Sequence, residues 1–130
     1  THFNEAQKKQ SVPKKERRFM KVQIKENDNL TMIALQGDLD FHSSPNLRKD
    51  LAKMVENQAA KIAFDLKKVD YIDSSGLATF VELYQKMKRY GGKFALYNLT
   101  EGAQSVFEIA KLNSIFQIAK TEEEALALIA

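Results

Sequence analysis

Two adjacent serines followed by a glycine are the residues of this chain best placed to do chemistry. Ser74 and Ser75 follow a short apolar run at residues 61–66 and precede apolar residues repeated at helical spacing over 78–90. A hydroxyl at the start of a helix lies beside N–H groups without intrahelical acceptors and beside the positive end of the helix dipole. Since phosphate binds well at such a position, the pattern predicts that one of these serines can carry a reversible phosphate.

Strand-like and helix-like patterns alternate along the chain and must position these serines. Strands that alternate with helices favour parallel pairing, and a turn at residues 26–29 makes only the first strand antiparallel. We therefore predict one α/β domain with a central, mostly parallel sheet of four or five strands, one antiparallel edge strand and about four helices. The predicted strands are 19–25, 30–36, 61–66, 93–97 and 115–119, and the predicted helices begin at Pro45, Ser75, Ala103 and Glu122.

Capping residues and apolar stripes define these helices. Ser44 before Pro45 is the expected N-cap of the first helix, and Thr121 with Glu124 forms a capping box at the last one. Gly91 and Gly92 should end the second helix. The residues expected to face inward are Leu47, Leu51, Met54 and Val55 in the first helix, Leu77, Phe80, Val81, Tyr84 and Met87 in the second, and Val106, Phe107, Ile109 and Ala110 in the third.

Length and composition limit the class of protein. A chain of 130 residues with 44% hydrophobic content is long enough for one core but not for two comfortable domains. It contains no cysteine, which excludes disulfides and thiolate chemistry. No apolar run approaches the ~20 residues of a membrane span, and residues 1–19 lack the apolar stretch of a signal peptide. We expect a soluble cytoplasmic protein.

The net charge of +3 is concentrated at the N-terminus. Residues 1–19 hold six basic and two acidic side chains, a balance of +4, which leaves −1 for residues 20–130. The folded part is therefore not basic, and no direct contact with nucleic acid is expected. We interpret residues 1–19 as a basic, disordered arm or a remnant of an engineered start, and residues 20–130 as the domain.

Enzymatic and metal-dependent functions find little support. His42 lies beside Ser43 and Ser44, but a serine nucleophile also needs an oriented base and an oxyanion site, and the chain has only two histidines. The histidines and carboxylates lack the spacing of a zinc or calcium site. Asp65, Asp70 and Asp73 crowd one strand and loop, unlike an acid cluster drawn from separate strand ends. We expect no catalysis, no metal and no cofactor.

Four motifs in order give the chain from about Met20 onward a family resemblance. They are Gly37-Asp38-Leu39-Asp40, Asp73-Ser74-Ser75-Gly76-Leu77, Tyr90-Gly91-Gly92-Lys93 and Thr121-Glu122-Glu123-Glu124-Ala125-Leu126. This region resembles the STAS domain, and specifically the freestanding bacterial anti-sigma factor antagonists. The sequence departs from the family pattern at Ala78, where glycine often follows the leucine, and in the N-terminal arm, which the family does not require.

The resemblance implies a partner switch that regulates transcription. In such antagonists the unphosphorylated form binds an anti-sigma factor serine kinase and frees the sigma factor. The kinase phosphorylates the antagonist, and a PP2C-type phosphatase reverses the modification. Matching the motifs makes Ser74 the phosphorylation site, with Ser75 as second choice, and Asp40 a partner contact. The other expected partner-binding residues are Asp73, Ser75, Gly76, Leu77, Ala78 and Thr79.

Two alternatives remain open at this point. STAS-like domains also act as adaptor or accessory subunits of transport, secretion or signalling complexes without a sigma-factor output. The same kinase and phosphatase logic can also control secretion or motility. We expect a monomer, although the sequence leaves the oligomeric state open.

Overall fold

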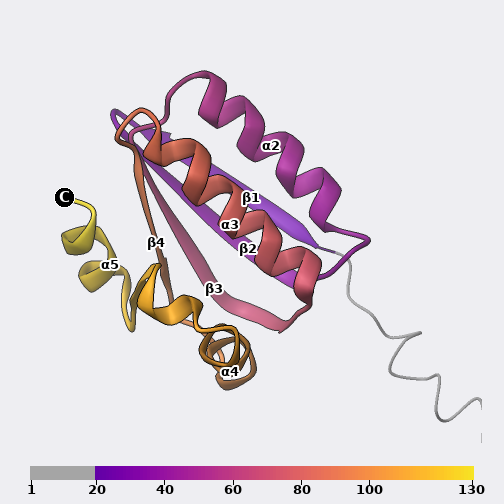
Figure 1. Cartoon of the computed structure of the whole chain (residues 1–130). Helices are drawn as coiled ribbons and strands as arrows, with labels where there is room; N and C mark the ends of the chain where they lie inside the picture. The colour runs from indigo at the N-terminus through magenta and orange to yellow at the C-terminus, as the bar shows by residue number, and fades with distance from the viewer. Residues whose placement is uncertain (1–19) are drawn as a thin grey trace, which may run out of the picture.

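A computed structural model describes residues 20–130, which form a five-stranded sheet in the order β1-β2-β3-β4-β5 (Figure 1). The sheet contains one antiparallel pair, β1 with β2, and the remaining pairs are parallel. The prediction of a mostly parallel sheet with an antiparallel edge strand is confirmed. The predicted basic arm, residues 1–19, lies outside the described residues. The strands are β1 (Lys21–Asn27), β2 (Leu30–Leu39), β3 (Lys61–Ile72), β4 (Lys93–Tyr97) and β5 (Gln117–Ala119).

Four α-helices cover the sheet unequally. They are α2 (Ser44–Glu56), α3 (Ser74–Lys88), α4 (Glu101–Ile109) and α5 (Glu122–Leu128), with a 3-10 helix, η1 (Leu112–Ser114), before β5. Helices α2 and α3 lie side by side across one face (Figure 1). Because successive side chains of a strand point to opposite faces, Phe64 packs under these helices while Ala63 contacts α5 on the other face.

Phenylalanine rings form the centre of the main core. The buried Phe80 of α3 meets Phe64 of β3 edge-on at a centroid distance of 5.2 Å. It also lies 6.3 Å from Phe94 of β4 and 6.0 Å from Phe107 of α4. Such ring pairs stabilise a core beyond the area that they bury. This cluster joins α3 and α4 to the middle of the sheet, and the predicted inward positions of Phe80 and Phe107 are confirmed.

Strand β3 is longer than the sequence pattern predicts. It runs to Ile72 instead of ending near residue 66. Its pairing with β2 shifts twice, between Ala34 and Gln36 and again between Gln36 and Asp38, and each shift leaves one extra residue in β3. These irregularities disturb the alternation of polar and apolar residues, so the polar second half of the strand reads as a loop.

The helix starts differ from the predictions in two places. Ser44 is the first residue of α2 and not its N-cap, because its hydroxyl donates instead to the carbonyl oxygen of Asp40 at 2.6 Å. The predicted capping box of α5 forms in a modified way. The Thr121 hydroxyl accepts from the Glu124 N–H at 3.2 Å, whereas the Glu124 carboxylate accepts from the Lys120 N–H, one residue earlier than the motif requires.

Several inward-facing residues were also assigned wrongly. Ile109 is 82% exposed and Ala110 is exposed, because α4 ends at Ile109 and its buried face carries Ala103 and Phe107. In α3 the buried face includes Leu83 in addition to the predicted Phe80 and Met87. The predicted Leu77, Val81 and Tyr84 are only half-buried at the margin of the core.

The aromatic cluster makes Phe80 a strong test of this packing. Phe80→Ala should lower the free energy of unfolding by about 3–5 kcal/mol, since it deletes a buried ring whose neighbours cannot all collapse into the space. Urea denaturation followed by circular dichroism measures this loss. The matched control is Phe41→Ala, which truncates a phenylalanine that is 60% exposed and should change stability by less than about 0.5 kcal/mol. Equal losses would contradict the described core.

Candidate functional site

The predicted serines lie at the edge of the sheet where β2 and β3 end together. Leu39, the last residue of β2, is paired with Ile72, the last residue of β3. The chain then leaves these neighbouring strands for α2 and α3. The Asp73 N–H donates to the Leu39 carbonyl oxygen at 3.1 Å, so the two strand-to-helix connections are bonded directly to each other.

The side chain of Asp73 holds this junction. Its Oδ1 accepts from the Gly76 N–H at 3.0 Å, which makes Asp73 the N-cap of α3. Its Oδ2 accepts from the Phe41 N–H, also at 3.0 Å, in the β2–α2 connection. The N-cap of α3 is therefore an aspartate and not one of the two serines. Ser74 and Ser75 are the first two helical residues.

Ser74 and Ser75 differ in accessibility. Ser74 is exposed, whereas Ser75 is half-buried and its carbonyl oxygen accepts from the Thr79 hydroxyl at 3.0 Å. Both serines belong to the first turn, whose N–H groups have no acceptor within the helix. The exposed Ser74 therefore stands at the positive end of α3, next in sequence to Asp73.

Asp40 lies beside the serines, as expected, but its carboxylate faces inward. The residue is 3% exposed. Its Oδ1 accepts from the N–H groups of His42 at 2.9 Å and Ser43 at 3.1 Å, which fixes the turn into α2. The Phe41 N–H, between Asp40 and His42, is bonded to Asp73, so the backbone of this turn is also held to the β3–α3 connection. Asp40 therefore contributes to the site by fixing the turn that carries Phe41, while its own carboxylate is buried.

Gly76 allows the two connections to approach. A Cβ atom at this position would lie 2.7 Å from the Leu39 carbonyl oxygen and 2.9 Å from the Ile72 Cγ2, closer than real contacts allow. Glycine is therefore required by close packing and not by its backbone angles. Leu39 and Ile72, the paired last residues of β2 and β3, are thus the residues that Gly76 approaches most closely.

Thr79 does not lie where the sequence analysis placed it. It was expected on the outer surface of α3, but it is 1% exposed and lies where α2 and α3 meet. Its hydroxyl donates to the Ser75 carbonyl oxygen, so the buried hydroxyl has a hydrogen-bond partner. Leu77 and Ala78, which follow Gly76 in α3, are half-buried, and Leu77 packs against the core.

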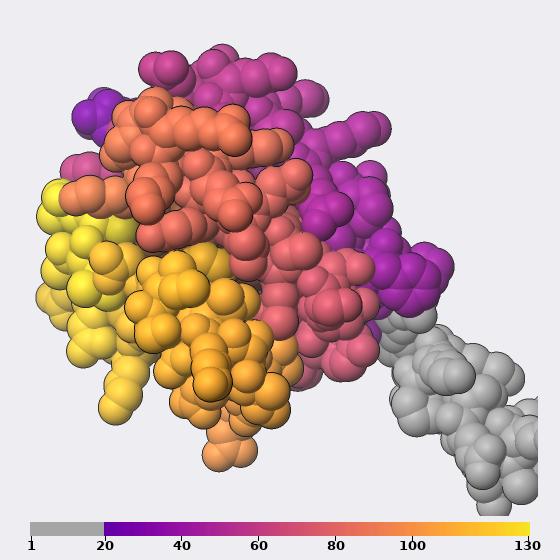
Figure 2. All heavy atoms as spheres, in the orientation of Figure 1, coloured from indigo at the N-terminus to yellow at the C-terminus, as the bar shows by residue number. Residues whose placement is uncertain are grey.

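Two exposed aromatic residues at this edge escaped the sequence analysis. Phe41 is 60% exposed and Tyr71 is 54% exposed. Tyr71 is paired with Asp38 in the sheet, and Phe41 follows the buried Asp40. In Figure 2 the start of α2, in purple, adjoins the end of β3, in pink, on one side of the molecule. The available signal was an aromatic residue directly after Asp40 and another two residues before Asp73, outside every predicted apolar stripe.

A metal site, a membrane-spanning helix and an acidic cluster are three further features that could indicate function. Among residues 20–130, no group of three histidines, aspartates or glutamates is arranged to hold a metal ion. The helices of this region are all too short or too polar to cross a membrane. The acidic residue Asp65 lies away from the serines and accepts from the Lys67 N–H at 3.1 Å and the Asn98 side chain at 3.2 Å.

The sequence of this chain is similar to those of known bacterial proteins. Over 102 residues the chain is 36% identical to the anti-sigma-B factor antagonist of Bacillus subtilis, covering 78% of this chain and 93% of that protein. It is 28% identical over 104 residues to the anti-sigma-B factor antagonist of Listeria monocytogenes, covering 79% of this chain and 91% of the relative.

Solved structures share the fold at lower sequence identity. An anti-sigma factor antagonist from Mycobacterium paratuberculosis superposes with a TM-score of 0.77 at 19% identity, over 85% of this chain and 93% of that one. The phosphorylated form of SpoIIAA, a Bacillus cell fate determinant, has a TM-score of 0.67 at 23% identity, over 85% of this chain and 100% of that one. The sequence model of the STAS domain matches residues 21–125, and the chain therefore belongs to the STAS domain family.

Proposed function

We propose that this protein is an anti-sigma factor antagonist that works as a phosphorylation-controlled partner switch. The unphosphorylated form binds an anti-sigma factor serine kinase and so releases the sigma factor. Phosphorylation of Ser74 ends this binding, and a PP2C-type phosphatase restores it. The protein itself performs no catalysis. The names of its relatives support this proposal, since they are anti-sigma-B factor antagonists matched over more than nine-tenths of their length.

The observation that carries the proposal is the position of the Ser74 hydroxyl. It is exposed to a modifying enzyme, and it stands in a first helical turn that is fastened by the Asp73 carboxylate. A phosphate adds about −1.5 to −2 charges at neutral pH. Next to Asp73 it would concentrate negative charge where the two connections meet. A partner that fits the unmodified surface would then face a desolvated like charge.

The surface around Ser74 has the composition of a recognition site. Phe41 and Tyr71 expose aromatic rings, and the half-buried Leu77 and Ala78 add small apolar area on α3. Aromatic side chains surrounded by polar groups are typical anchors of protein interfaces. Because the Phe41 N–H donates to the Asp73 carboxylate, the backbone of this aromatic residue is held next to the residue that precedes Ser74. We call Phe41, Tyr71, Ser74, Leu77 and Ala78 the switch surface.

Charge placed at Ser74 should prevent binding. Ser74→Asp is expected to weaken affinity for the cognate kinase by about a hundredfold, since a like charge in a desolvated interface costs several kcal/mol. Ser74→Ala should bind like the unaltered protein. Isothermal titration calorimetry measures both. Ser114→Asp, which adds the same charge at the exposed Ser114 of η1, is the control and should leave affinity unchanged. Equal affinities for all variants would refute the switch.

Phosphate transfer should occur on the exposed serine. Incubation with the candidate kinase and ATP, followed by mass spectrometry of the peptide containing residues 73–77, should show one added phosphate. Ser74→Ala should abolish the modification, whereas Ser75→Ala should retain it because that hydroxyl is less accessible. Transfer to Ser75 alone would move the switch by one residue. Stable binding without any transfer would instead favour a non-switching adaptor.

The aromatic anchor gives an independent test of docking. Phe41→Ala should weaken partner binding by about tenfold or more, as the loss of a central aromatic anchor commonly costs at least about 1.4 kcal/mol. The control is Ile109→Ala, which removes another highly exposed apolar side chain outside the switch surface. Both variants should keep the urea midpoint of the unaltered protein. Unchanged affinity for Phe41→Ala would show that the partner docks elsewhere.

A further inference from the structure

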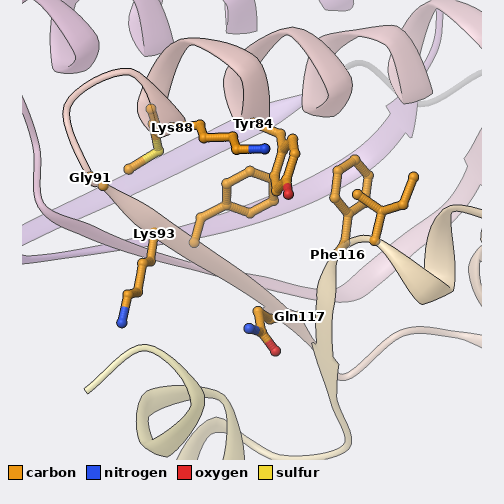
Figure 3. A pocket seen from close by; sticks show the side chains of 10 residues that line it. Tyr84, Lys88, Gly91, Lys93, Phe116 and Gln117 are labelled. Carbon is orange, nitrogen blue, oxygen red and sulfur yellow. The ribbon is translucent and has the colours of Figure 1, made fainter.

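A pocket lies at the end of α3 opposite Ser74 (Figure 3). It is bounded by the last turns of α3, the Gly91–Gly92 turn, the first residues of β4 and residues 115–117. Its volume is about 310 Å³, at the lower end of the ~300–1,000 Å³ typical of small-molecule sites. The pocket shares no residue with the switch surface.

The wall of this pocket is apolar and largely aromatic. Tyr84 and Met87 come from α3, Phe94 from β4, and Ile115 and Phe116 from the segment that leads into β5. The Phe116 ring lies 5.5 Å from the Phe94 ring and 5.8 Å from the Tyr84 ring, measured between centroids. Ile115 is half-exposed at this wall. Because Phe94 and Phe116 are only 5% and 6% exposed, a flat apolar group would pack mainly against the half-buried Tyr84 ring and Ile115.

The charge around the opening has one sign. Among residues 20–130, the charged side chains that line the pocket are Lys88 and Lys93, and no acidic residue joins them. The Lys88 ammonium lies 5.8 Å from the centre of the Tyr84 ring, where it adds positive potential to the aromatic wall. In Figure 3 the Lys88 side chain runs toward Tyr84, while Lys93 extends from the start of β4 away from α3. Both stems are flexible enough to turn toward a ligand.

We propose that this pocket binds a small organic anion with a flat apolar body, such as an aromatic carboxylate. The rings would hold the body, and Lys88 and Lys93 would face the carboxylate. Charge complementarity distinguishes this ligand from a neutral or cationic molecule of the same shape. The site requires neither the kinase nor a phosphate on Ser74, so it goes beyond the proposed switch and can be tested without a partner protein.

Naphthalene-2-carboxylate is a suitable probe, and titration of the isotopically labelled protein by nuclear magnetic resonance locates and measures its binding. Saturable shift changes should centre on the amides of Lys88, Gly91, Gly92, Phe94 and Gln117. The neutral isostere naphthalene-2-carboxamide should bind at least about threefold more weakly, because it gains no attraction from the two lysines. This comparison uses the unaltered protein and does not depend on any variant folding.

Charge reversal tests the role of the lysines. The double variant Lys88→Glu/Lys93→Glu should weaken carboxylate binding by about tenfold or more, since two weak attractions become two repulsions. The matched control is Lys49→Glu/Lys53→Glu, which changes the net charge equally at exposed positions of α2 outside the pocket. It should bind like the unaltered protein.

Three results would overturn the proposal. One is the absence of saturable shift changes at the pocket residues, or their appearance only elsewhere in the domain. Another is equal affinity for the carboxylate and the carboxamide. The last is equal weakening by both double variants, which would mean that only the net charge of the protein matters.

Discussion

The arrangement of the functional edge depends on one carboxylate. Asp73 accepts two backbone N–H groups, one from the first turn of its own helix and one from the connection that leads into α2. Hydrogen bonds to a charged acceptor are stronger than neutral ones. The two bonds to the Asp73 carboxylate join two strand-to-helix connections that are far apart in sequence, and the bond from the Asp73 N–H to the Leu39 carbonyl oxygen and the close packing at Gly76 add to this link.

At this edge, the residues that hold the loops together differ from the residues that a partner could contact. Asp73 and Asp40 direct their carboxylates toward backbone donors and hold the loops. Ser74 and the rings of Phe41 and Tyr71 remain at the surface on that fixed frame. A charge added to Ser74 therefore acts on whatever approaches the surface and does not require the fold to change. The helix end offers positive potential, but Asp73 already uses the Gly76 N–H, so an added phosphate shares this end with an existing negative charge.

Much of this organisation could be predicted from the sequence, and the failures have identifiable causes. Apolar periodicity and turn residues are local signals. They were sufficient to predict the strand at 93–97, the antiparallel first pair of strands and the start of a helix at the serines. The second half of β3 could not be predicted, because its irregular pairing is a property of two strands together. The burial of Thr79 depends on where α2 crosses α3, and the exposure of Phe41 depends on a bond to a residue 32 positions away.

The short β5 has a consequence for how the protein behaves among other chains. A sheet edge is a template on which foreign strands can add, and long apolar edges promote aggregation. Here one outer strand, β5, is only three residues long. The other outer strand, β1, carries the polar side chains Lys21, Gln23 and Lys25. Both borders are thus poor templates for strand addition. The protein can therefore expose Phe41 and Tyr71 where β2 and β3 end, while the two edges of its sheet offer little to a foreign strand.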